Sequence, residues 1–563
     1  MMLHQATSVI EPFLERFKHH PDAIAIIFMG DDGSEVNVTV EALHHKALDW
    51  SQALQNQGIG PGDIVIIARP HSLDLIAALL GAFYTGAVAS IFPYHIPAPN
   101  KTTYLEQLCL LVQAAQAQAV VVESSLKIDL DTMLAEAKCS TVDQPHRTSL
   151  DHKFSPFTEI SAHQVAYLQY TSGTTGLQKG VSLSHRAILH QTAVFSQALA
   201  INPQDVIVSW LPLYHDYGLF AGLMTPLLIG IPTVLMSPFK WLRHPQKYLS
   251  AIDKYKGTLS FLPNSAHNHT AHTLRAKNLT GLDLSSLRFL ANAAEPILYQ
   301  SQQLFLETFQ PYGFREEALT TGYGLAELTL MVTTSPTGQR ARVDWVDGQQ
   351  LLERRQSIPV DSNAPNAISL VSSGVPVAGM ALAIVNQQSE PLPERYVGEI
   401  AVQSESLFSG YHRRPDLSAK VLREGWCYTG DLGYIADGEL YVCGRKKDLI
   451  IIGGRNIHPE DIEAIAYTVP GIRPDKAAAF GVIDEVLGTE KAILVCELSQ
   501  SCDASSWHDI EQALRRRIFQ TLQLTMGEIH PVKKGWIIKT PNGKLSRTAN
   551  RQKYQALVNN KEA

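Results

Sequence analysis

Short apolar strands alternate with helical segments along most of this chain, and this alternation limits the fold more than any other sequence feature. Residues 23–28, 63–68 and 119–122 are apolar runs of strand length, and residues 73–84 and 104–117 carry helical patterns between or near them. Alternation of this kind predicts a mostly parallel sheet with helices on its faces. The sequence therefore predicts an α/β fold.

The length of the chain predicts more than one domain, because 563 residues exceed what a single hydrophobic core supports. After residues 440–448 the pattern restarts on a smaller scale, with a helix that begins at Pro459. We therefore expect a large domain over residues 1–446 and a small α+β domain over residues 447–563.

A second helix of the small domain is expected over residues 507–522. Its apolar residues recur at a spacing of four and share one face: Ile510, Leu514, Ile518 and Leu522. The same helix carries the basic run 515–517, which either faces solvent or contacts an acidic partner.

Composition excludes several classes of protein. The net charge of −7 argues against a nucleic-acid binder, which usually shows a basic balance. The six cysteines form no CxxC pair and no zinc-type spacing with histidine, and the first residues do not resemble a signal peptide. Scattered cysteines of this kind favour a reducing compartment, so a cytoplasmic location is expected.

Two apolar stretches, residues 73–92 and 219–236, are long enough to cross a bilayer. Glycine and proline interrupt both, which is typical of buried helix and strand pieces. We therefore expect no integral membrane span.

Residues 333–369 differ from their surroundings, because they are polar, contain three prolines and show weak periodicity. They are interpreted as an insertion between two structured pieces. An insertion of this length is often functional or mobile, and the alternative is a tolerated surface loop.

The strongest local motif is the run YTSGTTGLQKG at residues 170–180, which follows a strand-like segment. Glycines let the backbone approach an anion, and exposed N–H groups and hydroxyls hold phosphate oxygens. Lys179 adds a positive charge. The run lacks the Gly-x-x-x-x-Gly-Lys-Ser/Thr spacing of the common nucleotide loop, so a different kind of phosphate loop is expected.

The run closely resembles the phosphate loop of adenylate-forming enzymes, which include acyl-CoA synthetases, fatty acyl-AMP ligases, peptide-synthetase adenylation domains and luciferases. Further segments resemble motifs of that family in the expected order: TGYGLAE at 321–327, YTGD at 428–431, GRKKD at 444–448 and TPNGK at 540–544. The resemblance implies a large N-terminal domain of β/α subdomains with a small β-barrel-like part, followed by a small mobile α+β domain.

The resemblance implies an ATP site. The residues expected to hold the phosphates are Thr171, Ser172, Gly173, Thr174, Thr175, Gly176 and Lys179. The residues expected around adenine are Asn292, Ala293, Ala294, Glu295, Tyr323 and Gly324. Asp431 and Arg445 are expected at the ribose. Glu327 is expected to bind Mg²⁺, since a carboxylate oxygen suits that ion beside phosphates.

Lys544 is the expected catalytic residue of adenylate formation. A lysine ammonium neutralises the negative charge that develops when a carboxylate attacks the α-phosphorus and pyrophosphate leaves. The resemblance places the interdomain hinge at Lys447, about which the small domain rotates before a thiol attacks the acyl-adenylate.

The stretch WLPLYHDYG at residues 210–218 most resembles fatty acyl-AMP ligases, and it places His215 and Asp216 at the acyl pocket. In that subfamily an insertion at the position of residues 333–369 is thought to brace the two domains. The expected substrates are therefore a long-chain fatty acid and the phosphopantetheine thiol of an acyl carrier protein.

Other functions stay open at this point. Residues 453–459 also resemble coenzyme A ligases, so a fatty acyl-CoA synthetase is the nearest alternative. Asp216 lies near the position where amino-acid-activating domains bind the substrate ammonium, which keeps amino-acid adenylation as a third choice. A nucleotide-binding regulator without catalysis is a further alternative, and a serine hydrolase is disfavoured because no Gly-x-Ser-x-Gly run occurs.

Overall fold

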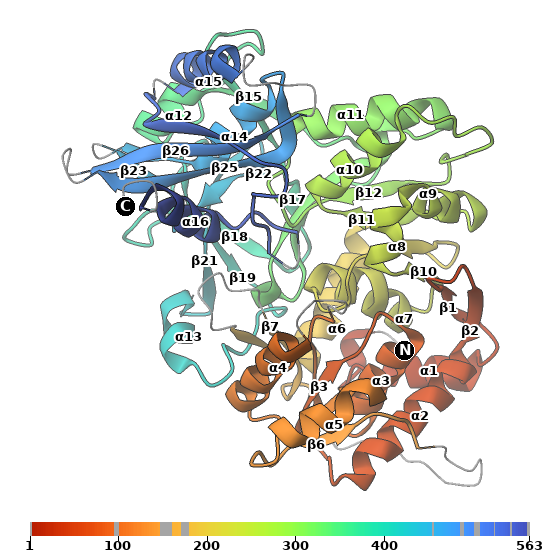
Figure 1. Cartoon of the computed structure of the whole chain (residues 1–563). Helices are drawn as coiled ribbons and strands as arrows, with labels where there is room; N and C mark the ends of the chain where they lie inside the picture. Colours follow the sequence, from red (N-terminus) through yellow and green to blue (C-terminus); the bar gives the residue numbers. More distant parts are fainter. Residues whose placement is uncertain are drawn as a thin grey trace.

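The computed structural model describes residues 3–94, 101–146, 160–170, 179–452, 455–484, 489–499, 507–522, 524–540 and 543–559. Within these residues the N-terminal part is built on two mostly parallel sheets with helices packed on them (Figure 1). The predicted α/β fold is confirmed.

The longer sheet has the strand order β17-β14-β13-β12-β11-β9-β10-β1-β2. The bounds in that order are β17 (Val375–Pro376), β14 (Met331–Thr334), β13 (Leu319–Gly324), β12 (Phe289–Asn292), β11 (Leu259–Leu262), β9 (Ile207–Ser209), β10 (Thr233–Met236), β1 (Ile24–Met29) and β2 (Glu35–Thr39). Strands from β1 through β13 in this order pair in parallel, whereas β2, β14 and β17 pair antiparallel. The central strands are buried on both faces, as a parallel sheet covered by helices requires.

The shorter sheet has the order β6-β5-β3-β4-β7-β8. Its bounds are β6 (Ser140–Val142), β5 (Ala119–Val122), β3 (Ile64–Ala68), β4 (Val88–Ile91), β7 (Val165–Tyr170) and β8 (Gly180–Ser184). β7 and β8 are antiparallel neighbours that flank the expected phosphate loop. Residues 171–178 of that loop, with Thr171, Ser172, Gly173, Thr174, Thr175 and Gly176, lie outside the described residues.

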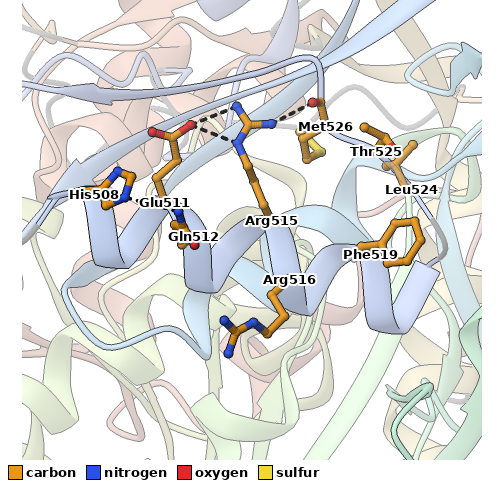
Figure 2. A pocket seen from close by; sticks show the side chains of 9 residues that line it. All are labelled: His508, Glu511, Gln512, Arg515, Arg516, Phe519, Leu524, Thr525 and Met526. Atoms are coloured by element: carbon orange, nitrogen blue, oxygen red, sulfur yellow. Dashed lines mark hydrogen bonds and ion pairs between the residues drawn. The ribbon is translucent and has the colours of Figure 1, made fainter.

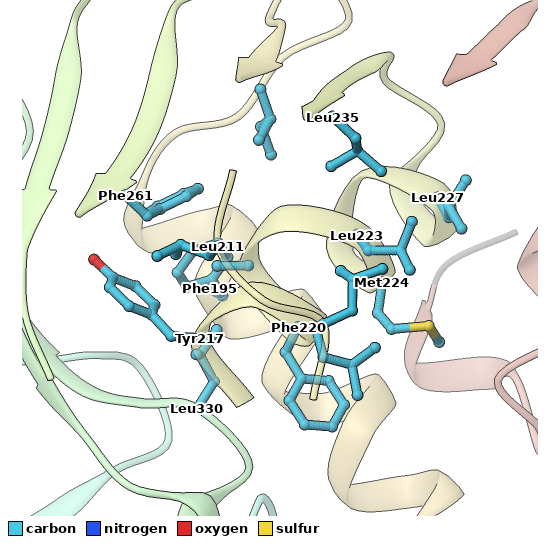
Figure 3. Packing of buried hydrophobic residues seen from close by; sticks show 14 of the residues in the cluster. Phe195, Leu211, Tyr217, Phe220, Leu223, Met224, Leu227, Leu235, Phe261 and Leu330 are labelled. Atoms are coloured by element: carbon cyan, nitrogen blue, oxygen red, sulfur yellow. The ribbon is translucent and has the colours of Figure 1, made fainter. Parts of the chain in front are cut away.

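The two long apolar stretches belong to the core. The first forms α3 (Leu73–Tyr84) and β4, and α3 packs against α2 (Val40–Asn56). The second forms a π-helix, η2 (Tyr217–Met224), then α7 (Thr225–Ile229) and β10. Figure 3 shows Phe220, Leu223 and Met224 of η2 packed among other buried apolar side chains. In the described part of the chain no helix is both long and apolar enough to span a bilayer.

Helices that flank the longer sheet include α6 (His185–Ala198), α8 (Pro238–Arg243), α9 (Pro245–Lys254), α10 (Asn264–Leu274) and α11 (Tyr299–Phe309). Local sequence explains their starts. Proline is the first residue of both α8 and α9, and the hydroxyls of Ser184 and Ser237 accept hydrogen bonds at the N-termini of α6 and α8.

An antiparallel sheet follows, with the order β18-β19-β21-β20 and with β22 paired to β21. Its bounds are β18 (Ala381–Val385), β19 (Gly398–Gln403), β20 (Leu422–Arg423), β21 (Trp426–Ala436) and β22 (Glu439–Arg445). It occupies the place in the chain of the small β part that the resemblance implied. The short helix α13 (Pro415–Val421) precedes β20.

The C-terminal part is α+β, as predicted. A hairpin of β23 (Ile450–Ile452) and β24 (Arg455–Ile457) leads to a sheet of β25 (Ile472–Asp484), β26 (Thr489–Leu498) and β27 (Glu528–Val532). The helices are α14 (Pro459–Tyr467), α15 (Trp507–Leu522) and α16 (Arg547–Asn559). The predicted apolar face of α15 is confirmed, because its four residues are all buried.

Residues 333–369, interpreted from the sequence as an insertion, contain regular structure, which argues against the alternative of a tolerated surface loop. This segment contains β15 (Val343–Asp347), α12 (Gly348–Arg354) and most of β16 (Ala367–Val371), and β15 pairs with β16 along its whole length. α12 lies against α15 (Figure 1), and Leu351 and Leu352 share an apolar cluster with the buried face of α15. The hydrophobic periodicity of residues 333–369 is weak because β15, α12 and β16 are short and each buries only a few residues.

The same cluster also contains Tyr434 and Tyr441 from before the predicted boundary at residue 446 and Ile450 and Ile462 from after it. One apolar cluster thus crosses the boundary that the sequence predicts, and the division at residues 446 and 447 stays a prediction.

We expect Gly348→Ala to loosen α12 from α15. A Cβ atom at residue 348 would lie 2.9 Å from the carbonyl oxygen of Thr521 and 3.3 Å from Leu522 Cδ2, so the helices must move apart. Overpacking of this kind costs about 1–3 kcal/mol. The measurement is the free energy of unfolding in urea, with Gly60→Ala as the control because nothing lies within 4 Å of a Cβ there. Equal stability of the two variants would contradict tight packing of α12 on α15.

Candidate active site

Tyr323, Asp431 and Arg445 form one hydrogen-bonded group, although they lie on three different strands. Tyr323 Oη donates to Asp431 Oδ2 at 2.8 Å, and Arg445 Nε donates to Asp431 Oδ1 at 3.0 Å. Asp431 on β21 and Arg445 on β22 are register partners, whereas Tyr323 reaches them from β13. Both oxygens of Asp431 are thus held in place and keep lone pairs for ligand hydroxyl groups.

Electrostatics keep this group in one protonation state near neutral pH. Burial, followed by the nearby charge of Asp431, raises the pKa of Tyr323 well above its usual value. The charge of Asp431 also raises the pKa of Arg445. Tyr323 and Arg445 therefore remain donors to Asp431.

Glu327 lies in the 3-10 turn η5 (Ala326–Leu328), directly after β13. Tyr411 Oη donates to Glu327 Oε1 at 2.7 Å. Lys179, the last residue of the expected phosphate group and the first after the undescribed loop, has its Nζ atom 4.8 Å from the centroid of the Tyr411 ring. The structure thus brings Lys179 and Glu327 together through Tyr411, a residue that the sequence analysis missed.

Gly324, at the end of β13, lets the start of β14 approach β13 closely. A Cβ atom at residue 324 would lie 1.7 Å from the carbonyl oxygen of Leu330, so only glycine fits. Gly324 therefore shapes the turn that carries Glu327, and a contact with adenine remains a prediction.

Residues 292–295 follow the carboxyl end of β12. The Asn292 side chain is fully buried and its Nδ2 donates to Asn264 Oδ1 at 3.1 Å, so it braces the start of α10. A contact of Asn292 with adenine stays a prediction. Ala293 is also buried, and Ala294 adopts a left-handed backbone with φ of 68°, which turns the chain toward Glu295.

Glu295 caps α10, because it accepts hydrogen bonds from the Ser265 backbone N at 2.7 Å and from Ser265 Oγ at 3.2 Å. Burial raises the pKa of Glu295, and the charge of Lys539 opposes that rise. Glu295 is thus a fixed acceptor near the C-terminal part of the chain.

Lys544 reaches this site from a turn of the C-terminal part. Thr540 and Lys544 close the turn through a backbone hydrogen bond of 2.7 Å, and Gly543 inside it has φ of 81°. Burial lowers the pKa of Lys544, while the charges of Asp216, Glu295 and Asp431 raise it and that of Arg445 lowers it. The charges that act on this ammonium therefore come from three segments that are distant in sequence, since Asp431 and Arg445 lie on the paired strands β21 and β22.

His215 and Asp216 precede the π-helix η2. His215 Nδ1 is 2.5 Å from Asp216 Oδ1, and the Tyr217 backbone N donates to the same oxygen at 2.7 Å. Burial opposes ionisation of Asp216, but His215 and Lys544 outweigh it and lower the pKa of the carboxyl. π-Helical turns often occur at functional sites. The charge of Asp216 acts on Lys544, and Tyr217, the residue after the pair, belongs to the buried apolar cluster of Figure 3.

Lys447 follows Arg445 at the expected hinge. Burial, together with the charges of Arg445 and Lys179, lowers the pKa of Lys447. The adjacent Asp448 pairs with Arg547 at 3.2 Å, and Arg547 also binds Glu460 and Glu463 at 2.6 Å each. Arg547 lies three residues after Lys544. Its ion pair with Asp448 therefore links the turn that carries Lys544 to the residue that follows Lys447.

The basic run 515–517 is mostly engaged within its own domain. Figure 2 shows Arg515 bound to Glu511 and to the carbonyl oxygen of Met526, with Nε–Oε1 and Nη1–O distances of 2.9 and 2.8 Å. Arg517 binds Thr468. Arg516 is exposed beside the half-exposed Phe519. Arg516 and Arg517 are exposed, as a solvated helix face predicts, and a contact of the run with an acidic partner stays a prediction.

Comparison with known proteins defines the class of enzyme. A family model of AMP-binding enzymes matches residues 13–412, and the chain therefore belongs to the AMP-binding enzyme family. The medium-chain-fatty-acid–[acyl-carrier-protein] ligase JamA of Moorena producens is 34% identical over 97% of this chain and 95% of its own length.

Solved structures agree with this similarity. A structure from a study of fatty acyl-adenylate ligases from E. coli and L. pneumophila superposes with a TM-score of 0.88 at 26% identity, covering 99% of each chain. The fatty acyl-adenylate ligase of L. pneumophila, in complex with acyl adenylate and pyrophosphate, is 30% identical, with a TM-score of 0.74 over 99% of this chain and 97% of that one.

We expect Asp431→Asn to weaken AMP binding by about tenfold or more, because a hydrogen bond to a charged group contributes roughly 1.5–3 kcal/mol. The measurement is isothermal titration calorimetry with AMP. Asp344→Asn is a matched control, since Asp344 also accepts from an arginine and a tyrosine, at 2.9 Å from Arg395 and 2.7 Å from Tyr434. Equal AMP affinity in the two variants would contradict a ligand contact at Asp431.

Proposed function

We propose that this chain activates a fatty acid with ATP to a fatty acyl-adenylate, releases pyrophosphate, and transfers the acyl group to the phosphopantetheine thiol of an acyl carrier protein. The observation that carries the proposal is the position of Lys544, whose ammonium lies in the electrostatic field of Asp216, Glu295, Asp431 and Arg445. The names of the similar ligases support the choice of fatty acid and carrier protein.

In the first step the fatty acid carboxylate attacks the α-phosphorus, and the bond between the α-phosphorus and the bridging oxygen breaks. Lys544 supplies positive charge where negative charge develops, and holds the two reactants together. Asp431 accepts hydrogen bonds from the ribose hydroxyls while Tyr323 and Arg445 hold its carboxylate. Lys179 binds phosphate oxygens at the end of the loop.

The residues around Glu327 fit Mg²⁺. Tyr411 occupies one lone pair of one carboxylate oxygen, which leaves further oxygen lone pairs for a hard cation. In the described residues no cluster of three or more acidic, histidine or cysteine side chains forms a metal cage. This agrees with an ion bound by one carboxylate and the substrate phosphates. When bound, Mg²⁺ neutralises charge on the phosphates.

In the second step the carrier thiol attacks the acyl carbon, a thioester forms, and AMP leaves. Lys544 must withdraw to admit the thiol, and the proposed centre of that rotation is Lys447, the position implied by the family resemblance. The packing of α12 on α15 supports a role for residues 333–369 in restricting that rotation.

Asp216 already pairs with His215 at 2.5 Å and accepts a hydrogen bond from the Tyr217 backbone N, which disfavours the substrate ammonium of an amino acid at this carboxylate. A cytoplasmic location is also part of the proposal, and the free cysteines at residues 109, 139, 427, 443 and 496 support it.

The experiment that tests the proposal is a radiolabelled-ATP assay with laurate, followed by a chase with coenzyme A or a phosphopantetheinylated carrier protein. Accumulated acyl-AMP with transfer to the carrier and little acyl-CoA is the expected result. Rapid acyl-CoA formation would instead assign the chain to the coenzyme A synthetases. No labelled adenylate with any fatty acid would overturn the proposal.

We expect Lys544→Ala to slow pyrophosphate release about 100-fold or more, because removal of one preorganised positive group from a transition state has an effect of that size. ATP binding should change little, since the other phosphate and ribose contacts remain. The control is Lys534→Ala, which removes an exposed lysine of the same domain. Near wild-type turnover in Lys544→Ala would refute the assignment.

We expect Asp216→Asn to move the alkaline limb of the pH–rate profile to lower pH. Lys544 acts as an ammonium, so activity falls as pH rises through its pKa. Burial lowers that pKa, and Asp216 raises it, so loss of the Asp216 charge lowers it further. The measurement is pyrophosphate release against pH, and an unmoved alkaline limb would show that Asp216 does not act on Lys544.

A further inference from the structure

Residues 404–412, between β19 and α13, join two parts of the site that are far apart in sequence. The Phe408 backbone N donates to the Glu327 carbonyl oxygen at 2.8 Å. The His412 backbone N donates to the Gly180 carbonyl oxygen at 2.7 Å, and Val181 and Tyr411 form an isolated bridge. One segment therefore fixes both the turn that carries Glu327 and the strand that follows the phosphate loop.

Tyr411 is the residue of this segment that touches both functional groups. Its side chain is 7% exposed, so the hydroxyl has little competition from water. The hydroxyl donates to Glu327 Oε1 at 2.7 Å, and the Lys179 ammonium lies 4.8 Å from the ring centroid. A buried ring below a cation stabilises it without neutralising its charge. The ring therefore holds the Lys179 side chain in place for an anionic ligand.

The turn after Glu327 is held in an unfavourable backbone conformation. Thr329 has φ of 68° and ψ of −50°, which a β-branched residue rarely adopts. Its hydroxyl donates to the Ser406 carbonyl oxygen at 2.9 Å, so residues 404–412 also anchor this residue. Backbone strain of this kind persists where the surrounding structure holds a functional group in place.

We propose that Tyr411 is a positioning residue for adenylate formation. Its hydroxyl fixes one oxygen of Glu327 so that the carboxylate is oriented toward Mg²⁺, and its ring holds the Lys179 ammonium beside the phosphates. The inference rests on the proposed roles of Glu327 and Lys179. A residue that only packed the core would need the ring and its contact with Phe408, whose centroid lies 5.0 Å away, but not the hydroxyl.

The test compares Tyr411→Phe with Tyr554→Phe. Tyr554 is a matched control, because it is 3% exposed and its hydroxyl donates to Glu528 Oε2 at 2.8 Å in the C-terminal part. The readouts are the affinity for a non-hydrolysable ATP analogue by calorimetry, with and without Mg²⁺, the Mg²⁺ dependence of pyrophosphate release, and the melting temperature.

In Tyr411→Phe we expect the gain in analogue affinity on adding Mg²⁺ to fall about tenfold, the size of effect of one hydrogen bond to a charged group. The Mg²⁺ concentration for half-maximal rate should rise, while affinity without Mg²⁺ stays unchanged. Tyr554→Phe should show wild-type values for both. Tyr411→Leu, which also removes the ring, should in addition weaken binding of the analogue without Mg²⁺.

Glu327→Gln separates failure of this inference from failure of the proposed function. If Glu327→Gln loses the Mg²⁺ effect and Tyr411→Phe keeps it, Tyr411 is a packing residue and the inference is wrong. If both variants keep it, Glu327 does not bind the ion, and that part of the proposed function fails as well. A fall in melting temperature of Tyr411→Phe without any change in Mg²⁺ dependence would also overturn the inference.

Discussion

The rest of the site depends on the charge interaction between the half-buried Lys544 and carboxylates of the N-terminal part. Removing an ammonium from water carries a desolvation penalty that is offset only where opposite charges lie close by. Asp216, Glu295 and Asp431 supply that charge from the N-terminal part, and each is itself held by a fixed donor. Lys544 of the C-terminal part is thus stabilised as an ammonium by carboxylates of the N-terminal part.

Further contacts hold the C-terminal part in this position. Asn268 of α10 donates to Asp475 Oδ2 at 2.8 Å, which joins the two parts beside Glu295. α12 covers the apolar face of α15, and Gly444 lets β22 pass close to Glu460, where a Cβ would lie 2.6 Å from Oε2. A movement about Lys447, which stays a prediction, would break the hydrogen bond between Asn268 and Asp475.

Contacts between distant segments also join residues that are proposed to act at the phosphates. Tyr411 connects Lys179 with Glu327, and residues 404–412 connect β8 with the strained turn at Thr329. Nothing in the local pattern around Tyr411 marks it, because a tyrosine after glycine in a polar stretch is typical of a turn. Its role depends on Glu327 and Lys179, which precede it in the sequence by 84 and 232 residues. A pair of residues that far apart meets only through the path of the whole chain.

The sequence by itself determined the α/β class and the apolar face of α15, because periodicity is a local property. The charged residues proposed for the site came from the resemblance of short motifs, which are also local. Tertiary structure alone decided that α12 is a packed element, that Asn292 faces the core and that Arg515 and Arg517 are engaged. It also decided which carboxylates surround Lys544. These features depend on which surfaces meet, and burial and hydrogen bonding between distant segments are determined only when the chain is folded.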